Sequence, residues 1–135
     1  DDINYIKQLV RRYNLDDDVV FINYQPEPFP IVKQALFTVL TSNYEGFPMS
    51  IIESLASGTP VVSVDCPSGP GEVIKNNVNG LLVETNNPPA LATAFNTFIS
   101  DADLYKRCKE NAVSSVQHLD VNVIAKAWQN LLENE

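Results

Sequence analysis

Short apolar runs that alternate with helical patterns constrain the fold of this chain most strongly. Four such runs have the length and the β-branched or aromatic content of buried strands: residues 19–22, 37–41, 61–64 and 80–83. No turn of the Asn-Gly type joins two of these runs directly, and helical patterns lie between them. We therefore predict an α/β domain with a Rossmann-like, doubly wound parallel sheet.

The predicted helices follow from apolar spacing and from Pro and Gly at their ends. They cover residues 3–13, 30–34, 49–57, 71–75, 88–99, 101–116 and 121–132. Gly58 is expected just beyond the third of them, at the position where a left-handed residue ends a helix. Trp128 is expected on the core face of the last helix, or against a partner domain that is absent from this chain.

Four strands are few for this architecture, so we expect a first strand to be missing at the amino end. The chain begins with Asp1 rather than Met and already within a helical pattern. We therefore expect residues 1–135 to be a piece of a longer polypeptide.

Composition excludes some classes of function. Seventeen Asp and Glu against nine Lys and Arg give a net charge of −8, which argues against a surface for nucleic acid or anionic lipid. No apolar run approaches the roughly 20 residues that span a bilayer, so no transmembrane segment is expected. Cys66 and Cys108 lie far apart in the sequence and are expected to be free thiols in a reducing, cytoplasmic compartment.

Two carboxylates eight positions apart, Glu45 and Glu53, form the strongest candidate site. Glu45 follows a predicted strand, and Glu53 lies one turn into the next helix. Between them, the Gly46–Pro48 turn and the helix start can direct backbone N–H groups at an anion. Ser50 and Glu53 also fit a capping box, in which Glu53 would accept from the Ser50 N–H. The pattern alone leaves both interpretations open.

No metal site is expected. Residues 16–18 are consecutive Asp residues, which point in different directions and indicate a solvated loop. No Asp-x-Asp element lies in a plausible site.

Several ordered blocks resemble one enzyme family over about residues 3–132. Residues 42–53 and 56–62 resemble the Glu-x7-Glu signature of family 4 retaining glycosyltransferases. Residues 65–74 and 79–83 resemble the next two blocks of that family in order and spacing, and residues 20–25 resemble the strand and loop that precede them.

The resemblance implies a GT-B fold, in which two Rossmann-like domains enclose the active site. This chain would be most of the carboxyl-terminal, nucleotide-sugar-binding domain, without its first strand and without the amino-terminal acceptor domain. The family's glycine-rich turn and the Arg and Lys that neutralise the diphosphate have no counterpart here. Gly71 stands where relatives often have Arg. We therefore expect the fragment alone to bind nucleotide weakly and to be inactive.

The resemblance also implies roles for individual residues. Glu45 would be the catalytic-site residue that holds donor sugar hydroxyls and faces the anomeric carbon. Glu53 would bind the ribose hydroxyls. The other donor-binding residues would be Gly46, Phe47 and Pro48 around the sugar and Met49 and Ser50 near the diphosphate, with Asn23, Tyr24 and Gln25 in the nucleobase loop.

The implied activity of the full protein is transfer of a hexose from a nucleotide diphosphate sugar, with UDP as the expected nucleotide. The acceptor would be a glycan or a lipid-linked sugar in polysaccharide synthesis, without cofactor or metal. The missing domain could hold the protein at the periphery of the inner membrane. The alternative is a non-catalytic nucleotide- or sugar-binding module, or one that self-associates through bared apolar surface. Epimerases and phosphorylases share the GT-B fold, but residues 45–48 match the transferase pattern more fully.

Overall fold

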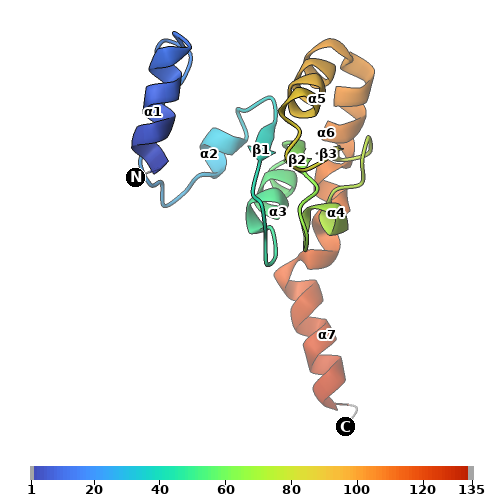
Figure 1. The fold of residues 1–135 in the computed structure, drawn as a ribbon. Helices are drawn as coiled ribbons and strands as arrows, with labels where there is room; N and C mark the ends of the chain where they lie inside the picture. The colour runs from blue at the N-terminus through green and yellow to red at the C-terminus, as the bar shows by residue number, and fades with distance from the viewer. Residues whose placement is uncertain (1, 134–135) are drawn as a thin grey trace.

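The sheet is parallel, as predicted. The computed structural model describes residues 2–133, and within them three strands pair in the order β1 (Thr38–Leu40), β2 (Val61–Val64) and β3 (Gly80–Val83) (Figure 1). Thr38 pairs with Val61, and Val61 pairs with Gly80. All three strands therefore end at the same edge of the sheet, where parallel α/β domains bind their ligands.

The helices agree with the predicted ranges to within a few residues. They are α1 (Asp2–Arg12), α2 (Phe29–Val32), α3 (Met49–Ala56), α4 (Pro70–Val73), α5 (Pro88–Ser100), α6 (Ala102–Val116), the 3-10 turn η1 (Gln117–Leu119) and α7 (Val121–Glu133). Gly58 follows α3 with φ +80°, as predicted. The side chains of Asn87 and Asp101 accept from the first-turn N–H groups of α5 and α6.

The central strand divides the core into two layers. Every residue of β2 is buried, and neighbouring residues point to opposite faces. Val61 packs with Leu55 of α3 and Ala112 of α6, whereas Val62 packs with Phe98 of α5. Helices therefore cover both faces of the sheet, and the doubly wound arrangement is confirmed.

A chain of hydrogen bonds joins α2, β1 and α3. The hydroxyls of Thr38 and Ser54 lie 2.7 Å apart, and Ser54 Oγ donates to the Thr59 carbonyl at 2.9 Å. Thr59 Oγ1 donates to the Val32 carbonyl at 2.9 Å. Because Ser54 and Thr59 are buried, these bonds satisfy groups that would otherwise be desolvated without a partner.

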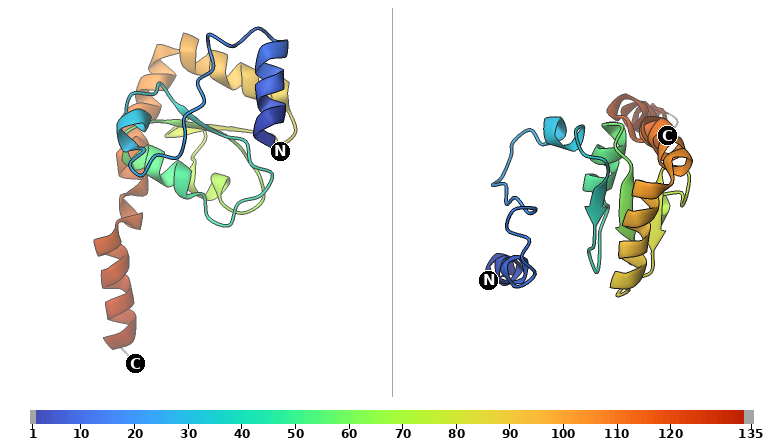
Figure 2. Two further views of the ribbon diagram at one scale, coloured as in Figure 1. Left: turned by 90° about the vertical axis from the view of Figure 1, so that its left-hand side faces the viewer. Right: turned by 90° about the horizontal axis from the view of Figure 1, so that it is seen from above.

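The prediction of a buried strand over residues 19–22 is wrong. This segment has no strand pairing, and Val20, Phe21 and Ile22 are 78%, 41% and 57% exposed. Figures 1 and 2 show α1 and the segment after it standing apart from the sheet, beyond the open edge of β1. A strand needs a neighbour for its backbone groups, and no strand lies beside this segment in residues 2–133.

The expectation that Trp128 lies in the core is also wrong. Helix α7 has no buried residue and extends away from the body of the domain (Figure 1). Trp128 is 61% exposed, and Ile124, Leu131 and Leu132 are exposed with it.

None of the helices in residues 2–133 combines the length and the apolar character that crossing a membrane requires.

Both cysteines are free thiols, as expected, and both are buried. Burial raises the pKa of Cys108, with Arg107 and a backbone hydrogen bond from Gly80 acting in the opposite direction.

Replacing Ser54 tests the hydrogen-bonded link between β1 and α3. Ser54→Ala removes the hydroxyl that contacts Thr38 and the Thr59 carbonyl. We expect a loss of about 1–3 kcal/mol in the free energy of unfolding, because the Thr38 hydroxyl and the Thr59 carbonyl each lose a hydrogen-bond partner. Urea denaturation measures this loss. Ser114→Ala is the matched control, since that hydroxyl is exposed and bonds only to Asn111 of its own helix. Equal stability of the two variants would contradict the assignment.

Candidate functional site

Glu45 lies on the loop that leaves the carboxyl end of β1, and Glu53 lies in α3, the helix that follows this loop. Both side chains are half-buried. Neither carboxylate forms a hydrogen bond or an ion pair with any residue in the range 2–133. Two carboxylates that have acceptor capacity and no protein donor can bind hydroxyl groups of a ligand.

The start of α3 does not form a capping box, so that alternative for Glu53 is wrong. The helix begins at Met49 after Pro48, and no side chain caps it. The Met49 N–H donates to the Phe47 carbonyl at 2.8 Å, so this amide, which we expected to point outward, is already occupied. Within the described chain, the Ser50 N–H has no acceptor. One of the two expected amides thus remains available to a ligand.

A hollow of about 300 Å³ lies beside Glu53, between α2, β1 and α3. Ser50 and Glu53 contribute polar side chains to it, and Phe29, Val32 and Leu40 contribute apolar ones. Sequence reasoning missed the α2 residues. The proline-rich run around Phe29 was the available signal, since it places this ring at a helix start a few residues after the expected nucleobase loop.

The predicted nucleobase loop does not line this hollow. Tyr24 is 89% exposed, and Asn23 and Gln25 are exposed as well. The Gln25 amide donates to the Asn23 carbonyl at 3.1 Å, a contact within the loop itself. The structure therefore brings Glu53 and Ser50 together and leaves residues 23–25 apart from them.

A second loop packs against the Glu45–Pro48 loop. Gly69 has φ +126°, and a Cβ atom there would lie 2.6 Å from Pro48 Cδ. A side chain is thus excluded both by conformation and by space. Beside this contact lies a hollow of about 450 Å³, lined by residues 65–69, 71, 72 and 85. At Gly71, a Cβ would lie 2.8 Å from Asp65 Oδ1, so an Arg there would displace that carboxylate.

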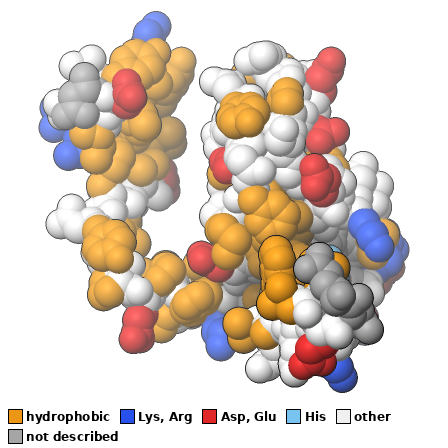
Figure 3. Space-filling view, turned by 90° about the horizontal axis from the view of Figure 1, so that it is seen from below, with side chains coloured by type: hydrophobic (Ala, Val, Ile, Leu, Met, Phe, Trp, Pro, Cys, Tyr) orange, Lys and Arg blue, Asp and Glu red, His pale blue; other side chains and the backbone are white. Residues whose placement is uncertain are grey.

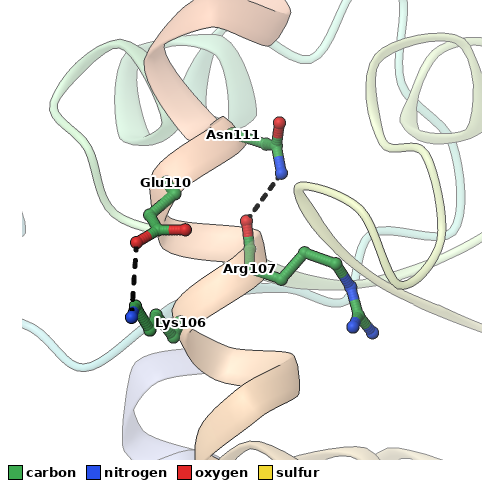
Figure 4. Close-up of polar contacts among 4 residues, drawn as sticks. All are labelled: Lys106, Arg107, Glu110 and Asn111. Carbon is green, nitrogen blue, oxygen red and sulfur yellow. Dashed lines mark hydrogen bonds and ion pairs between the residues drawn. The ribbon is translucent and has the colours of Figure 1, made fainter.

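The basic side chains on α6 are engaged elsewhere. The Lys106 ammonium lies 3.9 Å from the Glu110 carboxylate, and the Asn111 amide donates to the Arg107 carbonyl (Figure 4). The Arg107 guanidinium donates to the Asn77 carbonyl at 2.9 Å. No Lys or Arg lines either the hollow beside Glu53 or the hollow beside Gly69. In residues 2–133, no group of three or more His, Cys, Asp and Glu side chains could hold a metal ion.

Known proteins are similar to this chain in sequence. The family described as Glycosyl transferases group 1 matches residues 1–114. Lipopolysaccharide 1,6-galactosyltransferase of Escherichia coli K12 is 38% identical over 94 residues, which cover 67% of this chain and 26% of the enzyme. Poly(ribitol-phosphate) alpha-N-acetylglucosaminyltransferase of Staphylococcus aureus is 29% identical over 133 residues, which cover 96% of this chain and 26% of that protein.

Solved structures share the fold. Anabaena Alr3699/HepE in complex with UDP superposes with a TM-score of 0.90 at 26% identity, over 98% of this chain and 37% of that one. The lipopolysaccharide outer core galactosyltransferase WaaB superposes with a TM-score of 0.85 at 26% identity, over 98% of this chain and 38% of that one. The predicted fold class is confirmed as a partial Rossmann-like domain of the GT-B type. The chain spans between 26% and 38% of the length of these four proteins.

Two glycine substitutions separate a glycine that the fold requires from one that it does not. A Cβ atom at Gly46 would have no heavy atom within 4 Å, so we expect Gly46→Ala to change stability by less than about 0.5 kcal/mol. Gly69→Ala should destabilise by about 1–3 kcal/mol, because of its positive φ and the contact with Pro48. Denaturant unfolding compares the two. A loss at Gly46 as large as that at Gly69 would show that the fold itself requires Gly46.

Proposed function

Because the chain belongs to the group 1 glycosyltransferases, we propose that residues 1–135 form the donor-binding, carboxyl-terminal domain of a family 4 retaining enzyme. The full protein would transfer a hexose from a UDP-sugar to a glycan or lipid-linked acceptor. Relatives named for lipopolysaccharide and poly(ribitol-phosphate) transfer support an acceptor of the surface-polysaccharide kind. The similarity to a structure solved with UDP supports the nucleotide.

One observation carries the proposal: two carboxylates without protein partners in residues 2–133, Glu45 and Glu53, lie on either side of the helix start that follows β1. In the proposed site Glu53 accepts hydrogen bonds from the ribose hydroxyls, and the Ser50 N–H donates to the diphosphate. Glu45 accepts from hydroxyls of the donor sugar and faces the anomeric carbon. Gly46 and Phe47 enclose the sugar, and Pro48 holds this loop against Gly69.

The proposed chemistry depends on the placement of the donor sugar beside the acceptor and on stabilisation of the charge of the leaving diphosphate. The bond between the anomeric carbon and the diphosphate breaks, the acceptor oxygen bonds to that carbon on the same face of the sugar, and the acceptor's proton passes to the leaving diphosphate. The leaving diphosphate gains negative charge, which N–H donors and cations stabilise. The two hollows described above supply no cation, so basic groups from another part of the polypeptide would complete the site. We propose no metal and no cofactor for this step.

A binding or self-associating module remains the second candidate. The exposed apolar residues of segment 19–22 and of α7 favour it, because contiguous apolar surface promotes association. Transfer of sugar by the natural polypeptide would decide against this candidate.

Titration of UDP tests the role of Glu53. In the natural polypeptide that contains these residues, Glu53→Gln should weaken UDP binding about 10- to 100-fold, the effect of removing hydrogen bonds to a charged group. Calorimetry gives the dissociation constants. Glu110→Gln is the matched control, because that carboxylate is exposed on α6 and contacts only Lys106. Equal affinities for the two variants would contradict the ribose-binding role.

A further inference from the structure

A hollow of about 650 Å³ lies at the edge of the domain opposite the candidate site. Three lysines line it, Lys33, Lys106 and Lys109, together with Ser57, Gly58 and Tyr105. Ser57 and Gly58 lie just ahead of β2, at the amino ends of the parallel strands, whereas Glu45 follows the carboxyl end of β1. The volume is in the range of small-molecule sites, and a ligand bound here would be separate from one bound beside Glu53.

Two contacts hold the walls of this hollow together. Thr59 Oγ1 donates to the Val32 carbonyl at 2.9 Å, which joins the end of α2, just before Lys33, to the segment after α3. A Cβ atom at Gly58 would lie 3.8 Å from Val113 Cγ2, which is ordinary van der Waals contact, so this segment also lies against α6. The tertiary structure therefore fixes the hollow.

Positive charge gathers in the hollow. Three of the nine basic residues of the chain line it, and Glu110 is the one carboxylate among the lining residues. The lining side chains thus carry a charge of +2 in a chain whose net charge is −8. Lys106 lies 3.9 Å from Glu110, whereas neither Lys33 nor Lys109 pairs with a carboxylate of residues 2–133. Two ammonium groups are therefore available to an anion.

The other basic side chains lie away from this cluster. Figure 4 shows Lys106 and Glu110 on one side of α6 and Arg107 on the other, where the Arg107 guanidinium donates to the Asn77 carbonyl. Figure 3 shows the molecule from below, the end that carries α7 and the loop after β1, and the Lys and Arg side chains visible on that face lie at its rim. The cluster is therefore a local feature of the surface.

An aromatic ring forms part of the wall beside these lysines. Tyr105 is half-buried, and its ring packs edge-on against Phe98 with the ring centroids 5.9 Å apart. The Lys109 ammonium lies 5.7 Å from the centroid of the Tyr105 ring, a cation–π contact. This contact restricts Lys109, so less side-chain freedom is lost when the ammonium binds an anion.

We propose that this hollow binds a soluble ligand that carries a phosphate group. A phosphate carries more than one negative charge and several acceptor oxygens, so it can pair with Lys33 and Lys109 at once. The concave shape favours a small molecule over a membrane. Three lysines are also fewer than the four to eight basic residues that are typical of clusters that bind anionic lipid. The proposal depends on this hollow and not on the proposed catalytic roles.

Calorimetric titration with inorganic pyrophosphate tests the proposal in the natural polypeptide that contains these residues. Lys33→Gln combined with Lys109→Gln should weaken binding at least about tenfold, because two charge-assisted hydrogen bonds are lost. Lys75→Gln combined with Lys126→Gln removes the same charge outside the hollow. This control pair should leave the affinity within about twofold, because distant exposed charges are screened. None of these four lysines lines the two hollows near the candidate site, so binding there is common to all the titrations.

A charge-preserving pair separates binding from folding. Lys33→Arg combined with Lys109→Arg should retain most of the affinity, and because both lysines are exposed, all pairs should melt at similar temperatures. Equal losses in the two glutamine pairs, or no pyrophosphate binding that the Lys33 and Lys109 pair weakens, would overturn the proposal. Sedimentation with vesicles of phosphatidylglycerol and phosphatidylcholine gives the remaining outcome. If that pair abolished vesicle binding and left pyrophosphate binding unchanged, the proposal would be overturned in favour of a lipid headgroup.

Discussion

The burial of β2 on both faces and along both edges is the constraint on which the rest of the domain depends. Val61 and Val62 point to opposite layers, so one strand fixes α3 on one side and α5 on the other, and α6 contributes buried residues to both layers. Parallel pairing with β1 and β3 then places all strand ends at one edge. The loops that hold Glu45 and Gly69 meet there because of that pairing, and the contact of Gly69 with Pro48 fixes them together.

The candidate site follows from how α3 begins. Pro48 starts the helix without a side-chain cap, which leaves the Ser50 N–H and the Glu53 carboxylate without partners in residues 2–133. A capping box would have satisfied both groups internally and left nothing for a ligand. Ser50 is exposed and Glu53 is half-buried, so both groups are accessible and can pair with water or with a ligand. The proposed function makes a nucleotide sugar the ligand of these groups.

Local patterns predicted the interior of the domain well and its boundaries poorly. Strands β2 and β3 and helices α5 and α6 were predicted because their apolar residues are buried by neighbours within the chain. Segment 19–22 and Trp128 are equally apolar, but residues 2–133 leave them exposed. Apolar composition indicates that a segment tends to be buried, but it does not indicate which residues cover it. The occupied Met49 amide depends on the backbone conformation of Pro48, with φ −80° and ψ 73°, which the prediction of two outward amides did not consider.

A structure of the natural polypeptide with UDP tests the central claim most directly. The account predicts that the Glu53 carboxylate lies within hydrogen-bonding distance of the two ribose hydroxyls, with the Ser50 N–H directed at the diphosphate. The nucleotide would then occupy the carboxyl end of β1. UDP bound elsewhere, or Glu53 turned back to accept from the Ser50 N–H in the complex, would contradict it.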